Sequence, residues 1–171
     1  MNLEDHIRTV PNFPKPGVLF YDIGSIMSQP DVLKEAIKQL HLKIQPYQPQ
    51  LILGIESRGF LFAPPLAMDM NLPFGMVRKP GKLPGDIIGL DYALEYGEDR
   101  IEIQKDAIQP GQRVAIIDDL LATGGTMQAA VELVKKAGGV PVVTAYVIEL
   151  ENLKGRDKID LPQESLVKAE G

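Results

Sequence analysis

Apolar and polar residues follow two patterns along this chain, one typical of buried strands and one typical of amphipathic helices. Continuous apolar runs predict buried strands over residues 51–55, 114–117 and 140–148. Apolar residues at helical spacing predict helices over residues 31–43, where Ser28 suits a cap, and over about 125–137, where two glycines end the helix. Buried strands that alternate with helices predict an α/β fold with a mostly parallel central sheet flanked by helices.

Shorter segments complete this pattern. Residues 2–9 predict a short helix, and the prolines that follow predict an extended chain up to an apolar stretch at 18–20. After the strand at 51–55 we expect a helix over about 59–71, a strand over 74–78 and a long mobile loop over 79–90. Alternating residues on both sides of Gly97 predict an antiparallel hairpin. The last twenty residues carry the weakest signal.

Length and composition narrow the class of protein. A chain of 171 residues fits one domain. It has no cysteine, which excludes disulfides and cysteine-ligated zinc or iron–sulfur sites. The net charge of -5 argues against a dedicated nucleic-acid-binding domain, but not against a small phosphorylated ligand that is held locally. The start MNLEDHIRTV is too polar for a signal peptide, and the apolar runs fall short of the ~18 residues of a membrane span. We therefore expect a cytoplasmic protein without nucleic-acid or membrane partners.

The strongest chemical signal is the segment AIIDDLLATGGT, residues 115–126. An apolar strand ends in Asp118 and Asp119, and a short loop with two glycines and two threonines leads into a helix. Backbone N–H groups at a helix start bind phosphate, whereas the neighbouring carboxylates suit hydroxyl groups or a metal-chelated ligand. Two adjacent acids alone would be ordinary strand-end residues. The complete string predicts a phosphate beside a diol, as in ribose 5-phosphate.

Other phosphate and nucleophile motifs are not matched. A P-loop requires G-x-x-x-x-G-K-[ST], but Gly81 and Lys82 are followed by Leu83. The sequence contains neither the G-x-G-x-x-G of dinucleotide-binding folds nor the G-x-S-x-G of serine hydrolases.

The segment at 115–126 resembles the phosphoribosyl pyrophosphate signature of type I phosphoribosyltransferases, and DDLLATGGT is similar to the form found in the adenine-specific members. Other stretches agree in order and spacing: PKPGVLFYDI (14–23), GIESRGFLFAPPLA (54–67), VRKPGKLPG (77–85), YALEYGEDRIEIQKDAIQPGQRV (92–114) and LKGRDK (153–158). The resemblance covers residues 2–158. It implies the type I phosphoribosyltransferase fold, with one domain over 1–171, a small N-terminal hood over about 1–30 and a flexible catalytic β-hairpin loop over about 79–96.

The resemblance also implies a reaction and an assembly. Adenine and phosphoribosyl pyrophosphate give AMP and pyrophosphate, a step of purine salvage. Magnesium is expected as cofactor, held mainly through phosphoribosyl pyrophosphate and not directly by protein ligands. A homodimer is expected, and an apolar patch near Phe60 and Phe62 is a candidate interface.

For the phosphoribosyl donor, the resemblance implies three groups of contacts. The 5-phosphate is assigned to a loop of five residues, Ala122, Thr123, Gly124, Gly125 and Thr126. The ribose hydroxyls are assigned to Asp118 and Asp119. The pyrophosphate is assigned to one loop after a strand, with a cis Glu56–Ser57 peptide, and to three cations in a flexible segment: Glu56, Ser57 and Arg58, with Arg78, Lys79 and Lys82.

The same resemblance assigns catalysis and base recognition to a partly different set of residues, in which Arg58 appears again. Glu95 is the expected catalytic carboxylate, which accepts the proton from N9 of adenine or stabilises the tautomer that attacks. The resemblance places Arg58, the second expected catalytic residue, near both the purine and the pyrophosphate, and a planar guanidinium suits stacking on a purine and binding of oxyanions. The adenine pocket is assigned to Leu19, Tyr21, Arg58 and Leu120.

Two other functions remain compatible with the sequence. A transferase for a 6-oxopurine would share the donor site and differ in its choice of base. A non-catalytic regulator that senses nucleotides would use the same fold. Competition among purines tests the first alternative, and nucleotide binding without turnover would support the second.

Overall fold

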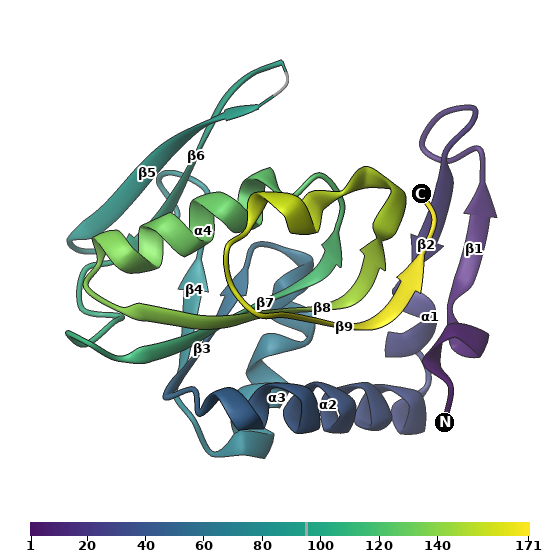
Figure 1. Cartoon of the computed structure of the whole chain (residues 1–171), viewed down its shortest axis with the longest axis horizontal. Coiled ribbons are helices and arrows are strands. Elements are labelled where there is room, and N and C mark those ends of the chain that lie inside the picture. The colour runs from purple at the N-terminus through teal and green to yellow at the C-terminus, as the bar shows by residue number, and fades with distance from the viewer. Residues whose placement is uncertain (95) are drawn as a thin grey trace.

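The computed structural model describes residues 1–94 and 96–171. A parallel five-stranded sheet lies at its centre, in the order β4–β3–β7–β8–β9 (Figure 1). Its strands are β3 (Leu51–Ile55), β4 (Phe74–Val77), β7 (Arg113–Leu121), β8 (Val140–Leu150) and β9 (Gln163–Ala169). β3 is buried along its whole length, as expected for an apolar run in the middle of a parallel sheet.

Helices cover both faces of the sheet. Alternate residues of a strand point to opposite faces, so Ile52 packs with α2 (Pro30–Ile44) and α3 (Ala63–Met70), while Leu51 and Leu53 pack with α4 (Gly125–Lys136). The short helix α1 (Gly24–Met27) joins the first of these two apolar clusters through Ile26. Within the described ranges, no helix combines the length and the apolar character that crossing a membrane requires.

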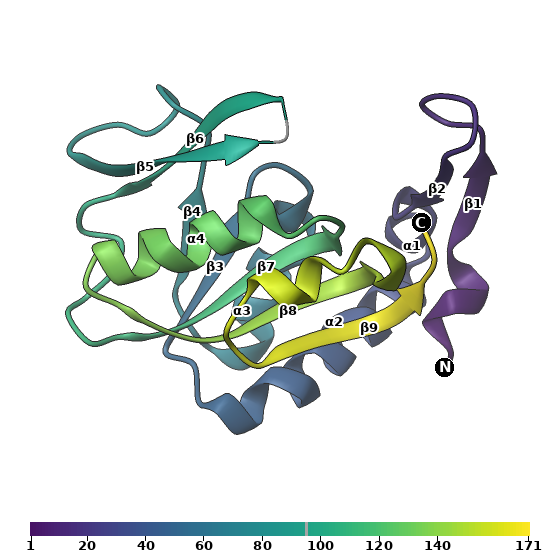
Figure 2. The ribbon, with the colours of Figure 1, turned by 45° about the horizontal axis from the view of Figure 1, so that its top comes forward.

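Two antiparallel hairpins project from opposite ends of the sheet (Figure 2). The N-terminal hairpin pairs β1 (Arg8–Pro11) with β2 (Leu19–Asp22), close to the C-terminal end of the chain (Figure 1). The second pairs β5 (Ile87–Leu94) with β6 (Gly97–Gln104), and Arg78 forms a bridge to Glu102 beside it. Short 3-10 turns complete the chain: η1 (Leu3–His6), η2 (Gln45–Tyr47), η3 (Arg58–Leu61), η4 (Glu151–Leu153) and η5 (Gly155–Lys158).

Some of the expected elements were wrong in extent. The helix expected at 2–9 is only the 3-10 turn η1, because the chain then enters β1 and pairs with β2. Ser28 does not cap α2: its hydroxyl donates to the Ser25 carbonyl, and Gln29 precedes the first helical residue. The loop expected up to residue 90 ends earlier, since β5 begins at Ile87.

The strand expected at 114–117 also proves longer. β7 continues to Leu121, so Asp118 and Asp119 lie inside the strand. Its pairing with β8 extends through this segment, with Asp118 opposite Tyr146 and Leu120 opposite Ile148. The C-terminal segment forms β9, the edge strand beside β8.

Candidate active site

The carboxyl ends of β3 and β7 lie side by side and open into one cavity. The two strands pair in parallel, with Gly54 opposite Ile117, so the segments that follow them emerge at the same edge of the sheet. The cavity has a volume of about 330 Å³. Its lining comprises Ile55, Glu56, Ser57, Arg58, Val77, Arg78, Lys79, Ile101 and residues 118–127.

The loop between β7 and α4 has the form of an anion site. Gly124 has a φ of +85°, a conformation that glycine adopts readily, and α4 begins at the next residue. The first N–H groups of a helix lack intrahelical partners and lie at the positive end of its dipole. A Cβ atom on Gly124 would lie 2.4 Å from the carbonyl oxygen of Gly155, so the backbones of this loop and of η5 are in close contact. The loop therefore offers backbone N–H groups at a helix start, and contact with η5 holds it in place. We call residues 122–126 the phosphate cradle.

Two carboxyl groups lie beside this cradle. Asp119 is buried, and its backbone N–H donates to Asp118 Oδ1 at 2.9 Å. Burial and the neighbouring Asp119 carboxylate raise the pKa of Asp118 well above its ordinary value, while Arg58 acts in the opposite direction. Arg58 Nε lies 3.0 Å from Asp119 Oδ2, which is an ion-pair distance without the alignment of a hydrogen bond. The segment after β3 is thus tied to the end of β7 through Arg58.

On the other side of the cavity, the Glu56 carboxylate contacts three basic residues of the segment after β4. It accepts hydrogen bonds from the backbone N–H of Lys79 at 2.7 Å, from Arg78 Nη2 at 3.1 Å and from Lys82 Nζ. Burial alone would raise the pKa of Glu56, but these donors outweigh it and lower the pKa to about 2. The Glu56–Ser57 peptide is cis, which confirms that expectation. The side chain is therefore an anion that holds three donors of the segment after β4.

The hairpin β5–β6 reaches the cavity through a chain of polar groups. Lys79 Nζ pairs with Asp99 on β6, and Asp99 also accepts a hydrogen bond from the Tyr92 hydroxyl at 3.1 Å. The same hydroxyl lies 3.4 Å from Thr126 Oγ1 in the phosphate cradle. Burial would lower the pKa of Lys79, but Asp99 raises it above its ordinary value. Asp99 and Tyr92 were not among the residues expected from the sequence, although the register pairs them directly across the hairpin.

The remaining expected residues fall into those that line or reach the cavity and those that lie outside it. Leu120 lines the cavity, and Lys82 reaches it through Glu56. Among the described residues, Leu19 and Tyr21 lie on β2 outside the cavity lining, and the Tyr21 hydroxyl donates to the Glu170 carbonyl at 2.7 Å. Glu95 lies outside the described residues. Their assigned roles stay predictions.

One expectation about the surface was wrong. Phe62, directly before α3, is fully buried in the core, so it contributes nothing to an exposed patch. Phe60 is half-buried, packs edge to face with Phe74 at 6.1 Å and lies beneath the Arg78 guanidinium at 6.0 Å.

Comparison with known proteins relates this chain to a family. The family model described as "Phosphoribosyl transferase domain" matches residues 22–166. An adenine phosphoribosyltransferase of Acidiphilium cryptum is 54% identical over 167 residues, which cover 98% of each chain. The chain belongs to the adenine phosphoribosyltransferase family.

Solved structures of adenine phosphoribosyltransferases share the fold. The Saccharomyces cerevisiae protein, solved with an imino-altritol bisphosphate and adenine, is 41% identical with a TM-score of 0.92, covering 96% of both chains. The Trypanosoma brucei protein, solved with AMP, pyrophosphate and ribose-5-phosphate, is 32% identical with a TM-score of 0.86, covering 97% of this chain and 78% of the other. The type I phosphoribosyltransferase fold expected from the sequence is confirmed.

Proposed function

We propose the following assignment for this chain: it transfers the 5-phosphoribosyl group from phosphoribosyl pyrophosphate to adenine, giving AMP and pyrophosphate. The observation that carries it is the meeting, in one cavity, of a backbone phosphate cradle, two carboxyl groups and a cluster of cations. A donor with a 5-phosphate, a ribose diol and a pyrophosphate needs these three environments side by side. The identity to named adenine phosphoribosyltransferases over nearly the whole chain supports adenine as the acceptor.

The proposed orientation of the donor follows the order of these three environments along the cavity. The 5-phosphate binds the N–H groups of residues 122–126 at the start of α4. The ribose hydroxyls then lie next to Asp118 and Asp119, which precede this loop by a few residues at the end of β7. The pyrophosphate lies toward the loop after β3, where Arg58 and the cations held by Glu56 exchange their carboxylate partners for pyrophosphate oxygens.

Catalysis in this site is electrostatic. As the bond between C1 of the ribose and the pyrophosphate oxygen breaks, positive charge develops on the sugar and negative charge on the leaving group. Arg78, Lys79 and Lys82 stabilise the leaving group, and the preorganised carboxylates face the sugar. N9 of adenine then bonds to C1 and loses its proton, for which Glu95 is the proposed acceptor. Closure of the segment at about 79–96 over the cavity would exclude water, which would otherwise capture the activated sugar.

Adenine lies between the cavity and the N-terminal hairpin in this proposal. Leu120 offers an apolar contact from the cavity wall, and Arg58 stacks on the ring. Leu19 and Tyr21 of β2 complete the pocket from the hairpin side, chiefly through the backbone of their strand. A backbone carbonyl that accepts from the 6-amino group distinguishes adenine from a 6-oxopurine.

Magnesium is proposed as a cofactor that arrives with the donor. The described residues contain no cluster of three or more side chains able to hold a metal ion by themselves. Mg²⁺ is commonly bound by one or two carboxylates together with substrate phosphates, and it keeps several waters. The buried Asp119 Oδ2 accepts no hydrogen bond within the described part of the chain, and it would fit such a role beside the donor once Arg58, its ion-pair partner, turns to the pyrophosphate. When bound, the ion would neutralise charge on the leaving pyrophosphate.

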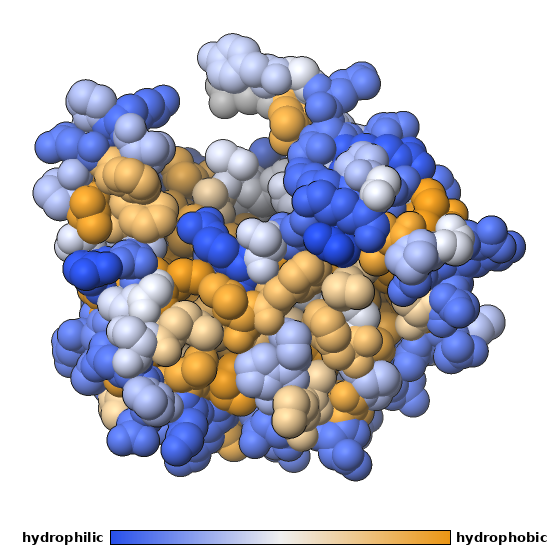
Figure 3. Space-filling model, turned by 180° about the vertical axis from the view of Figure 1, so that it is seen from behind, coloured by the Kyte–Doolittle hydropathy of each residue, from blue (hydrophilic) through white to orange (hydrophobic). Residues whose placement is uncertain are grey.

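We further propose a homodimer and a cytoplasmic location. Apolar side chains gather on the face seen in Figure 3, and large exposed apolar residues occur on η3, α3 and β4, namely Leu61, Met68 and Met76. An exposed apolar surface of this kind suits a second copy of the chain. Because a highly charged sugar phosphate does not cross a bilayer unaided, the enzyme is expected in the compartment that makes it.

A purine panel tests the proposed function. Purified protein is incubated with phosphoribosyl pyrophosphate, Mg²⁺ and equal concentrations of adenine, guanine, hypoxanthine and xanthine, and the nucleotides are separated. We expect AMP as the main product. Asp119→Asn should lose most of the activity, whereas Asp31→Asn, at an exposed position at the start of α2, serves as the matched control. A preference for a 6-oxopurine, or nucleotide binding without turnover, would overturn the assignment.

A further inference from the structure

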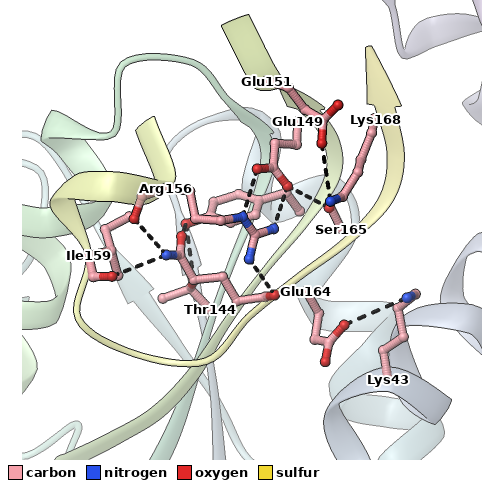
Figure 4. A network of polar contacts seen from close by, with 11 residues as sticks. Lys43, Thr144, Glu149, Glu151, Arg156, Ile159, Glu164, Ser165 and Lys168 are labelled. Carbon is pink, nitrogen blue, oxygen red and sulfur yellow. Dashed lines mark hydrogen bonds and ion pairs between the residues drawn. The ribbon is translucent and has the colours of Figure 1, made fainter. Parts of the chain in front are cut away.

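The turn between β8 and β9 is fixed by one guanidinium group. Arg156, on η5, donates from Nε to Glu149 Oε1 at 2.8 Å and pairs through Nη2 with Glu149 Oε2, while its Nη1 donates to the Gln163 carbonyl at 2.9 Å (Figure 4). Glu149 lies near the end of β8 and is 4% exposed. Ser165 of β9 donates to the same carboxylate at 2.7 Å. One arginine therefore ties the turn to both strands that flank it.

The contacts run in both directions. The Gln163 side-chain amide donates to the carbonyls of Arg156 at 2.9 Å and Ile159 at 3.1 Å. The bond from Arg156 lowers the pKa of Glu149, although burial opposes this change and Ser165 supports it. Glu149 is thus a buried anion whose position is set by a bidentate guanidinium. Such a pair fixes orientation strongly, but adds little net stability compared with apolar residues of the same volume.

The residue before Arg156 is the contact with the phosphate cradle. A Cβ atom on Gly155 would lie 2.3 Å from the Ala122 carbonyl oxygen and 3.0 Å from the Gly124 nitrogen. The reverse contact is equally close, since a Cβ on Gly124 would meet the Gly155 carbonyl at 2.4 Å. Backbone therefore rests directly on backbone, with no side chain between them. A shift of η5 toward the loop would therefore displace the loop as well.

We propose that Arg156 is a positioning residue for the 5-phosphate loop. Its fork on Glu149 and Gln163 holds η5 in place, and η5 holds residues 122–124 through Gly155. The inference rests on the proposed function, because the ligand of that loop is the 5-phosphate. Arg156 itself lies outside the cavity lining, so it acts through the loop and does not touch the substrate.

Three variants separate positioning from stability. Arg156→Lys keeps the charge but loses the fork that reaches Glu149 and the Gln163 carbonyl together. Glu149→Leu combined with Arg156→Met replaces the buried pair by apolar side chains and leaves neither charge unpaired. Lys168→Met, the control, removes an exposed ion pair with Glu151 on the same two strands, at 3.1 Å.

Two ligands provide the decisive measurement. Binding of ribose 5-phosphate and of pyrophosphate is measured separately by calorimetry, and the KM values for phosphoribosyl pyrophosphate and adenine are measured in AMP formation. In the double variant we expect ribose 5-phosphate binding and the KM for the donor to worsen about tenfold or more, since small misplacements of a binding group have effects of this order. Arg156→Lys, which keeps the charge beside Glu149, should show a smaller loss than the double variant. Pyrophosphate binding and the KM for adenine should stay near the wild-type values, as should all measurements on Lys168→Met.

The outcomes are distinguishable. Unchanged ribose 5-phosphate binding by the folded double variant overturns the proposal. Equal losses for ribose 5-phosphate and pyrophosphate also overturn it, because general loosening of the fold would affect both. If the double variant does not fold, the same measurements on Arg156→Lys decide. A wild-type protein that binds ribose 5-phosphate but forms no AMP contradicts the proposed function instead, and the positioning role is then judged by binding alone.

Discussion

Replacing Gly59 by alanine tests how closely the two loops of the cavity must approach each other. Gly59 is buried in η3, directly after Arg58. A Cβ atom there would lie 2.9 Å from the Ile117 carbonyl oxygen and 3.1 Å from Asp118 Oδ1, whereas ordinary contact begins at 3.4 Å. The first of these atoms belongs to the backbone of β7 and cannot swing away. The loop after β3 must therefore move away from the carboxyl end of β7.

The size of the effect follows from this shortfall. Restoring ordinary contact requires a displacement of about 0.5 Å, and a misplacement of ~1 Å can reduce rates by about a hundredfold. We therefore expect kcat/KM for phosphoribosyl pyrophosphate to fall about tenfold, which corresponds to ~1.4 kcal/mol of transition-state stabilisation. Overpacking should also lower the free energy of unfolding by ~1–3 kcal/mol.

Steady-state AMP formation with varied donor and saturating adenine measures the first effect, and denaturant unfolding measures the second. Gly139→Ala is the matched control, since its Cβ would be similarly crowded, 2.8 Å from Ile108 Cγ2, but just before β8, away from the cavity. It should lose stability and keep its kinetic constants. Folded Gly59→Ala with wild-type kcat/KM would refute the reasoning, and so would an equal kinetic loss in Gly139→Ala.

Three further predictions concern single hydrogen-bonded groups. Tyr92→Phe removes the hydroxyl between Asp99 and Thr126, so the KM for the donor should rise about fivefold, the equivalent of ~1 kcal/mol. An unchanged KM would show that this contact does not contribute to donor binding. Tyr21→Phe removes the bond to the Glu170 carbonyl and should lower the free energy of unfolding by ~1 kcal/mol in a denaturant titration. The pKa of Glu56 is about 2 in the folded protein against an ordinary 4.5, so its stabilising contribution is complete above pH 4.5 and is lost as the pH falls toward 2. Glu56→Gln should flatten this part of the curve of unfolding free energy against pH, and parallel curves for the two proteins would contradict the assignment.

The sequence predicted the parts of the fold that carry a strong periodic pattern. The apolar runs of β3, β7 and β8 and the amphipathic pattern of α2 and α4 correspond to real elements, because burial on one or both faces demands those patterns. β9 was not predicted, since an edge strand needs few apolar residues and exists here through its pairing with β8. The extension of β7 through Asp118 and Asp119 has the same origin, because pairing with β8 holds two acidic residues in extended form.

For the site, the sequence predicted local motifs, but it did not predict contacts between residues that lie far apart in the chain. The glycine-rich loop at 122–126 can be predicted from its local sequence, because a helix start and a tight turn need those residues. The partnership of Glu56 with Arg78 depends on the parallel register of β3 and β4, in which Ile55 faces Val77. Likewise, only the hairpin register brings Tyr92 opposite Asp99. These contacts follow from topology, which single-sequence patterns do not specify.

The pairing of cations with carboxylates around the cavity has a kinetic consequence. Arg58 is matched by Asp119, Lys79 by Asp99, and Arg78 with Lys82 by Glu56. A cleft lined by charges of one sign draws oppositely charged ligands from a distance and speeds their association by ~10 to 10³, in a manner that salt suppresses. Here the fields of neighbouring opposite charges largely cancel beyond the mouth of the cavity. Encounter with the polyanionic donor should therefore proceed at an unsteered rate with a shallow dependence on ionic strength, and discrimination between anions takes place only after contact.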